Sequence, residues 1–273
     1  MTLEKLNIQV DGSQPYARAT LYLIDPSPEL MTNERPLIVV CPGGAYAFTS
    51  DREAEMVALQ FTAMGYHAAV LRYSVAPARF PTAMLELGNV ICQARENSAK
   101  WHIDPNKIAV VGFSAGGHLA CSYCCLWNEG WAGEKLDVPS EQLRPNGMIL
   151  GYPVISSGEY AHHGSIMNLL GDDYENRKDE FALENRITDA VPPAFVWHTW
   201  EDGSVPVQNS LMLISAMTEK KIPAEFHMFR HGGHGLSLAN WITQGAGGGD
   251  LAPAATEWIP LLKTWLEDWR KND

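Results

Sequence analysis

The segment Ile108-Ala-Val-Val-Gly-Phe-Ser-Ala-Gly-Gly-His-Leu-Ala120 decides the fold of this chain. A β-branched apolar run leads into a Gly-x-Ser-x-Gly pattern at residues 112–116, and a segment with helical spacing follows. This order predicts a strand that turns sharply into a helix, because glycines on both sides of the turn relieve backbone crowding. Ser114 is then expected at the carboxyl end of a strand, with its hydroxyl projecting from the sheet.

The same alternation of short apolar runs and helix-length segments continues along the chain. The runs predict strands at residues 37–41, 68–71, 108–111, 148–150, 194–197 and 225–229. The segments between them predict helices at residues 51–64, 82–99, 115–126, 206–220 and 256–270. Two further strands are predicted before these, at residues 6–10 and 17–24, and they are expected to pair antiparallel as a lead-in to the sheet. The pattern therefore indicates an α/β fold with a mostly parallel central sheet flanked by helices.

Composition narrows the classes of function. The chain has 273 residues, of which 46% are hydrophobic and 19% are charged, and it contains no fixed-period repeat. We expect a single folded domain over residues 1–273. The formal charge of −12 disfavours nucleic acids, anionic membrane surfaces and strongly anionic substrates as partners.

Cysteine usage and the first residues predict a cytoplasmic protein. Five cysteines are an odd number for a disulfide framework, and Cys121, Cys124 and Cys125 are expected to form a packed thiol cluster in a helix. The first ten residues lack the pattern of a secretion signal. No second Cys or His pair accompanies the cysteines, and no further ligands converge on His162 and His163, so neither a metal nor a cofactor is predicted.

A serine nucleophile needs a base and an orienting acid, and in such sheets functional side chains follow the carboxyl ends of strands. Asp202 follows the predicted strand at residues 194–197, and His234 follows the strand at residues 225–229. Asp202 is therefore predicted as the acid and His234 as the base. Glu201 and His231 lie in the same loops and are the alternatives.

Acyl transfer also needs backbone donors for the oxyanion that forms. The loop Cys41-Pro-Gly-Gly-Ala-Tyr46 follows a strand, and Ala115 follows the serine. We predict Gly44, Ala45 and Ala115 as these donors. Tyr46, Phe48 and Trp200 are predicted to line the substrate pocket.

Several motifs together resemble a known family: Cys41-Pro-Gly-Gly-Ala-Tyr46, Ile103-Asp-Pro-Asn-Lys-Ile108, Gly112-Phe-Ser-Ala-Gly-Gly-His-Leu119, Tyr152-Pro-Val154, His198-Thr-Trp-Glu-Asp-Gly-Ser-Val-Pro206 and Gly232-Gly-His-Gly235. The chain resembles bacterial α/β-hydrolase carboxylesterases, and within them the acetyl esterase and acetyl-xylan-esterase-like group related to hormone-sensitive lipase. The resemblance implies an α/β-hydrolase fold and cofactor-free hydrolysis of short-chain acyl esters. Ser114, Asp202 and His234 match the family's triad. Pro42 stands where those relatives commonly carry the first residue of a His-Gly-Gly-Gly run, and little sequence precedes the first strand, which predicts a small cap or none.

The predicted function is a serine carboxylesterase acting on a small neutral ester, with an acetylated sugar among the options. A small lid at residues 155–190 is one expectation, and a surface segment without substrate contact is the other. A homo-oligomer is compatible with the sequence. A serine peptidase or thioesterase on the same fold is the nearer alternative, because a triad does not select the leaving group. A non-catalytic binding protein would be expected to lack a triad member, and none is missing here.

Overall fold

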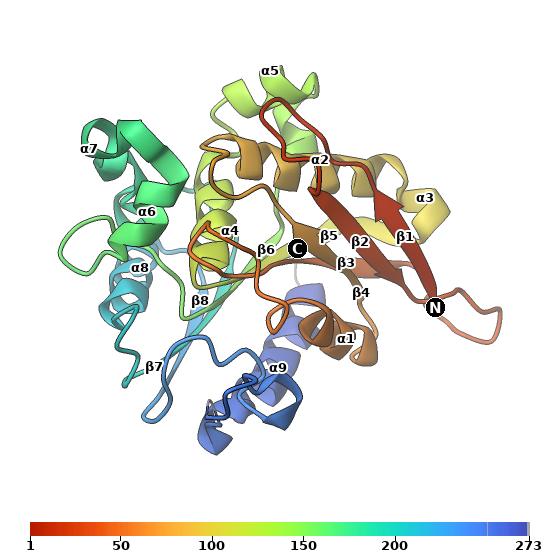
Figure 1. Ribbon diagram of the computed structural model, residues 1–273. Helices are drawn as coiled ribbons and strands as arrows, with labels where there is room; N and C mark the ends of the chain where they lie inside the picture. The colour runs from red at the N-terminus through yellow and green to blue at the C-terminus, as the bar shows by residue number, and fades with distance from the viewer. Residues whose placement is uncertain (250, 272–273) are drawn as a thin grey trace.

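The computed structural model describes residues 1–249 and 251–271 and has one eight-stranded sheet at its centre (Figure 1). Its strands are β1 (Thr2–Leu6), β2 (Arg18–Leu23), β3 (Arg35–Cys41), β4 (His67–Arg72), β5 (Ile103–Phe113), β6 (Gly147–Gly151), β7 (Ala194–Thr199) and β8 (Ala224–Phe229). Their spatial order is β1-β2-β4-β3-β5-β6-β7-β8. β1 and β2 pair antiparallel with their neighbours, and the pairs from β4 to β8 are parallel. The prediction of a mostly parallel sheet with an antiparallel lead-in is confirmed.

Helices cover both faces of this sheet. They are α1 (Glu55–Ala63), α2 (Thr82–Glu96), α3 (Ser98–Trp101), α4 (Ala115–Leu126), α5 (Trp131–Leu136), α6 (His163–Leu170), α7 (Tyr174–Arg177), α8 (Gln208–Glu219) and α9 (Trp258–Lys271). In Figure 1, α2 and α4 lie above the sheet, and α1 and α9 lie below it. Alternate residues of the buried strands point to the two faces, so β3 places Val39 in one apolar cluster and Val40 in the other.

One predicted strand is wrong in position. A strand was predicted at residues 6–10, where Leu6, Ile8 and Val10 alternate with polar residues, whereas β1 covers Thr2–Leu6 and pairs with β2. Ile8 is fully buried although it lies outside the strand. A buried side chain in an irregular segment therefore mimicked the period of a strand, while backbone pairing with β2 placed the real strand earlier.

All five cysteines are buried and free, and the predicted packing of Cys121, Cys124 and Cys125 within a helix is confirmed. Three of them lie on α4, behind the strand that carries Ser114. Among the described helices, none has both the length and the apolar character required to cross a lipid bilayer.

The strand order decides where polar side chains meet. β3, β5, β6, β7 and β8 are parallel and adjacent, so their carboxyl ends lie along one edge of the sheet. The loops that follow these strands contain the predicted donors, the serine, the acid and the base. They converge at this edge because parallel neighbours in register end at the same level.

Candidate active site

Ser114 lies between the last residue of β5 and the first residue of α4, with φ at +54° and ψ at −122°. A non-glycine residue adopts this conformation only where its surroundings enforce it. A Cβ atom on Gly112 would collide with the carbonyl of Gly116, and a Cβ atom on Gly116 would collide with the carbonyl of Cys41. The two glycines of the Gly-x-Ser-x-Gly pattern are therefore required for the turn that carries the serine.

Three side chains form a continuous hydrogen-bonded relay. The Ser114 Oγ atom lies 2.7 Å from Nε2 of His234, and Nδ1 of His234 lies 2.7 Å from Oδ2 of Asp202. Because an ionised carboxylate only accepts, Nδ1 donates to Asp202 and Nε2 is free to accept the serine proton. The His234 side chain is 21% exposed, whereas the Asp202 side chain is fully buried.

The surroundings of Asp202 keep it ionised. Burial raises the pKa of this carboxyl, but hydrogen bonds from His198, His234 and the Val205 N–H outweigh burial, and its pKa falls well below the usual range. Oδ1 accepts the backbone N–H groups of Ser204 at 3.0 Å and Val205 at 2.9 Å. These bonds fix the carboxylate, which leaves Oδ2 to face the imidazole.

The alternative acid and base pair with each other. Nδ1 of His231 lies 2.8 Å from Oε1 of Glu201, and Oε2 of Glu201 accepts the Gly232 N–H at 3.2 Å. Both side chains are exposed, at 62% and 49%. The structure thus brings Asp202 and His234 to Ser114, and it leaves Glu201 and His231 as a surface pair.

Two of the predicted oxyanion donors, Gly44 and Ala45, lie on the loop after β3, and the third, Ala115, directly follows Ser114. Gly44 and Ala45 have positive φ angles of 130° and 56°. A Cβ atom on Gly43 would lie 2.9 Å from Cβ of Ser114, so the loop packs directly against Ser114. Within the described part of the chain, the backbone N–H groups of Gly44, Ala45 and Ala115 have no acceptor. Ala115 is also the first residue of α4, whose N-terminus favours negative charge.

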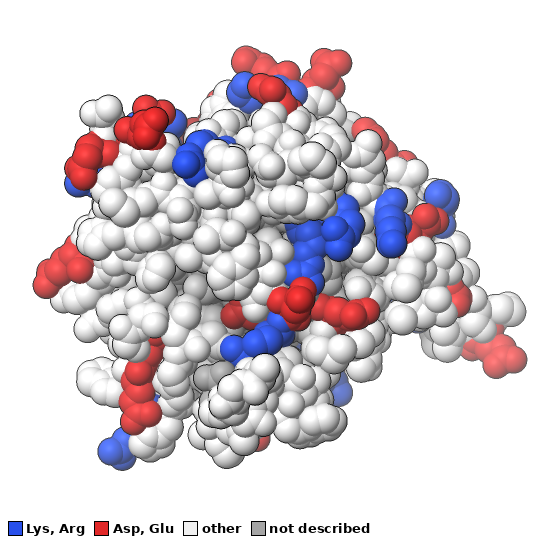
Figure 2. All heavy atoms as spheres, viewed as in Figure 1, with Lys and Arg blue, Asp and Glu red and all other residues white. Residues whose placement is uncertain are grey.

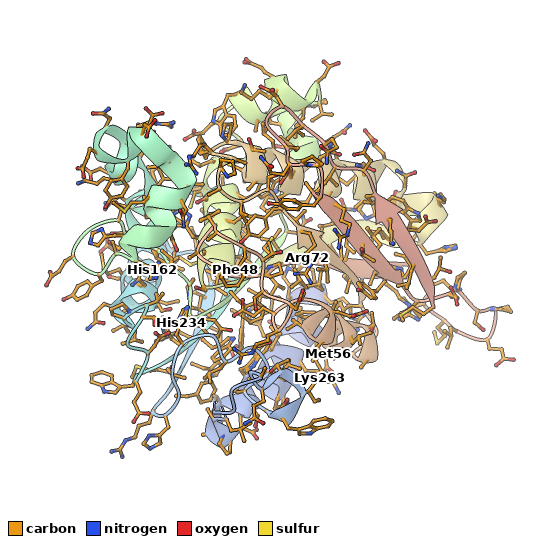
Figure 3. All side chains as sticks on the ribbon, in the orientation of Figure 1. Phe48, Met56, Arg72, His162, His234 and Lys263 are labelled. Carbon is orange, nitrogen blue, oxygen red and sulfur yellow. The ribbon has the colours of Figure 1, made fainter. Side chains whose placement is uncertain are left out.

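The three predicted pocket residues lie in different surroundings. Phe48 is 61% exposed, and Figure 3 shows it near His234. Tyr46 is only 2% exposed and lies beneath the loop, with its hydroxyl 3.0 Å from Nδ1 of His118. Trp200 is 62% exposed and lines a separate hollow of about 300 Å³ with Met228 and Arg230. Of the three, Phe48 is the residue whose backbone N–H donates to the Gly44 carbonyl, at 3.1 Å.

Three further residues lie at the site although the sequence analysis gave them no role there. His162 precedes α6, and it is close enough for the charge of His234 to help lower its pKa, an effect second to burial. Figure 3 shows it beside His234. Tyr152 follows β6 and packs its ring 5.1 Å from that of His234. Glu53 is buried and accepts a hydrogen bond from Gly43. Of these three residues, only Tyr152 could have been found from the sequence, because it follows the carboxyl end of a strand.

The two adjacent histidines do not form a metal pair. Nδ1 of His162 faces Ser165, whereas Nδ1 of His163 lies 2.8 Å from the Tyr174 hydroxyl. Among residues 1–249 and 251–271, no group of three or more His, Cys, Asp or Glu side chains is arranged to hold a metal ion.

Comparison with known families identifies the chain. A family model described as BD-FAE matches residues 26–217, which include the loop with Gly44 and Ala45, and also Ser114 and Asp202. The chain belongs to the BD-FAE family. The resemblance to acetyl-xylan-esterase-like proteins is thereby confirmed, as is the α/β-hydrolase fold.

Relatives of this BD-FAE chain include enzymes of xylan breakdown. It is 35% identical over 215 residues to endo-1,4-beta-xylanase B of Butyrivibrio fibrisolvens, and this match covers 76% of the chain and 33% of that protein. It is 29% identical to an acetylxylan esterase of Xylanibacter ruminicola over 75% of the chain and 42% of that protein. The chain therefore spans less than half the length of these two relatives.

A solved structure matches the BD-FAE chain over nearly its whole length. The acetyl ester-xyloside bifunctional hydrolase of Caldicellulosiruptor lactoaceticus is 36% identical, with a TM-score of 0.80. The match covers 93% of this chain and 89% of that one. The fold described above is therefore shared with a hydrolase of similar size.

Proposed function

We propose that this BD-FAE family member is a serine carboxylesterase that hydrolyses short acyl esters through an acyl-enzyme intermediate. The observation that carries the proposal is the relay from Ser114 through His234 to Asp202, with 2.7 Å at both links. Esterase names among its relatives support the same reaction class.

In the first half of the reaction, the Ser114 Oγ atom attacks the ester carbonyl carbon while Nε2 of His234 takes the hydroxyl proton. The carbonyl oxygen becomes an oxyanion that accepts from the N–H groups of Gly44, Ala45 and Ala115. The C–O bond to the alcohol then breaks, and the imidazolium returns its proton to the leaving alcohol oxygen. Asp202 stays ionised throughout and stabilises the imidazolium.

In the second half, a water molecule attacks the acyl carbon and gives one proton to Nε2 of His234. The tetrahedral adduct collapses when the bond between the acyl carbon and the Ser114 Oγ atom breaks. Oγ regains the proton from the imidazolium, and the carboxylic acid leaves. The reaction therefore needs only this chain's residues, the ester and water.

The side chains around Tyr46 are closely packed, which favours a short acyl group. Tyr46, Phe80 and Phe181 lie there together with neighbouring apolar side chains, and the remaining cavity is about 10 Å³. The face of the molecule around Phe48 and His234 is built mostly of uncharged residues (Figures 2 and 3). A neutral acetyl ester fits both properties, and the names of the relatives favour an acetylated xylose-type sugar as its alcohol part.

A substrate series tests the proposal. We expect kcat/KM for p-nitrophenyl acetate to exceed that for p-nitrophenyl octanoate by at least about 10-fold, since the packed side chains around Tyr46 leave little space for added methylenes. An aminoacyl p-nitroanilide is expected to show no measurable turnover. Amide turnover that equals or exceeds ester turnover would instead favour a serine peptidase and contradict the proposal.

His162 is proposed to contact the alcohol part of the substrate. Its Nδ1 atom accepts the Ser165 N–H at 3.3 Å and lies 2.9 Å from the Ser165 Oγ atom, so the neutral ring carries its proton on Nε2. Burial and the charge of His234 lower the pKa of His162, which keeps the ring neutral. The ring thus presents one N–H donor beside the relay, and a sugar hydroxyl can accept it.

Changing His162 to Asn keeps a side chain suited to begin α6 but removes the imidazole. We expect kcat/KM for an acetylated xylo-oligosaccharide to fall about 10-fold, the cost of one hydrogen bond, and kcat/KM for p-nitrophenyl acetate to change less than about threefold. His163→Asn, one residue along and turned to Tyr174, is the control and should leave both values unchanged. Equal losses on both substrates in His162→Asn would show that His162 has no role in alcohol recognition.

A further inference from the structure

Glu53 is buried directly behind the oxyanion loop. The residue is 4% exposed and precedes α1. Its Oε2 atom accepts the Gly43 N–H at 2.7 Å, and its Oε1 atom accepts the Tyr152 hydroxyl at 2.7 Å. A Cβ atom on Gly43 would lie 2.7 Å from Oε2 of Glu53 and 2.9 Å from Cβ of Ser114. The carboxylate therefore supports the segment that separates it from the nucleophile.

Tyr152 extends this contact to the histidine loop. Its ring meets that of His234 edge-on, with centroids 5.1 Å apart and an interplanar angle of 71°. Its hydroxyl accepts the Ser237 N–H at 2.7 Å, and the Ser237 Oγ atom donates to the Arg52 carbonyl at 2.6 Å. One network thus joins the oxyanion loop, the end of β6 and the loop that carries the base.

The network requires an ionised carboxylate. The Gly43 N–H can only donate, and the Tyr152 hydroxyl must donate to Glu53 because its oxygen already accepts from Ser237. Two donors thus face two oxygens. A protonated carboxyl or an amide would place a donor against one of these donors and leave a buried group without its acceptor.

Positive charges near the carboxylate also favour its ionised form. Burial raises the pKa of Glu53 above its usual value, and the hydrogen bonds from Tyr152 and Gly43 and the charges of His234 and Arg52 offset part of that rise. Burial is the main cause of the raised pKa of the Tyr73 phenol, and the negative charge of Glu53 adds to this rise. Electrostatic interaction is mutual, so the carboxylate favours the imidazolium form that His234 takes on during the reaction.

We propose that Glu53 is a positioning residue for the ester hydrolysis put forward above. It holds Gly43 so that the N–H groups of Gly44 and Ala45 face the oxyanion, and it holds the edge of Tyr152 against His234. The inference rests on the proposed function, because it assigns Glu53 a role in that reaction.

The test compares two buried glutamates. Glu86 is fully buried, and its carboxylate accepts from the Ser74 N–H and the hydroxyls of Ser74 and Ser13, but it touches no residue of the relay. Glu53→Gln is expected to lower kcat for p-nitrophenyl acetate about 10- to 100-fold, the cost of a displaced oxyanion donor, with KM changed less than about threefold. The acid limb of its kcat/KM profile is expected at lower pH than in the wild type. Glu86→Gln should keep kcat and the pH profile of the wild type.

Tyr152→Phe is the second variant, and it keeps the ring against His234 while removing the hydroxyl. We expect a kcat loss about 10-fold, and the double variant with Glu53→Gln should lose less than the product of the two single losses because both break one network. Thermal unfolding and circular dichroism verify the fold of each variant. A wild-type kcat in Glu53→Gln, equal losses in Glu86→Gln, or multiplicative losses in the double variant would each overturn the proposal.

Labelling separates this inference from the proposed function. Glu53→Gln should still react with an organophosphate at Ser114, to one adduct per chain but more slowly than the wild type. If wild-type Ser114 is not labelled, the proposed function fails whatever Glu53 does. If labelling and esterase activity are intact in the wild type and unaltered in Glu53→Gln, only the role of Glu53 fails.

Discussion

Replacing Ser114 by alanine is expected to lower kcat for p-nitrophenyl acetate by about 10⁴- to 10⁶-fold, because no other group at the site can form the acyl-enzyme. The fold should be retained, since alanine is smaller than serine and the flanking glycines already determine the turn. Residual activity would come from the oxyanion donors and binding alone. Initial rates across a substrate series measure kcat and KM separately.

An organophosphate provides a second readout of the same prediction. The wild-type chain should gain one phosphonyl adduct, and mass spectrometry of peptides should locate it at Ser114. Ser98→Ala is the control, because Ser98 lies on α3, before the start of β5, whereas Ser114 follows its end. Full esterase activity in Ser114→Ala, or an adduct that persists in that variant, would refute the serine mechanism.

Asp202→Asn is expected to lower kcat by about 10⁴-fold without unfolding the chain. The asparagine Oδ1 atom can still accept the Ser204 and Val205 N–H groups, so the turn is kept. Its amide nitrogen would then face Nδ1 of His234 and donate to it. The imidazole would carry its proton on Nε2, and that tautomer cannot accept the proton of Ser114.

Glu201→Gln is the matched control, because it removes the neighbouring carboxylate from the same loop. We expect kcat to change less than about twofold, since Glu201 pairs with His231 on the surface and an exposed pair contributes little. The pH dependence of kcat/KM, recorded for both variants, tests the tautomer argument. A larger loss in Glu201→Gln than in Asp202→Asn would transfer the role of the acid to Glu201.

Much of the fold could be predicted because its signals are local. Buried parallel strands are short apolar runs, and the helices between them show a helical period, so β3 to β8 were found near their observed places. The prediction of a strand at residues 6–10 was wrong for the same reason. Ile8 is buried like a strand residue, but the pairing of β1 with β2 ends at Leu6. An edge strand is defined by its partner, and a single segment does not contain that information.

The sequence by itself determined the turn around Ser114 and the loops that follow each strand. The contacts of Gly112 lie within a few residues of the serine, so the local sequence specifies them, whereas the contact of Gly116 with Cys41 also needs the neighbouring strand β3. Only the tertiary structure placed Asp202 and His234 in one hydrogen-bonded chain with Ser114, and Glu201 with His231 in a separate pair. It also placed Tyr46 beneath its loop and Glu53 behind Gly43. These outcomes depend on the order of strands in the sheet, which brings residues more than a hundred positions apart within hydrogen-bond distance.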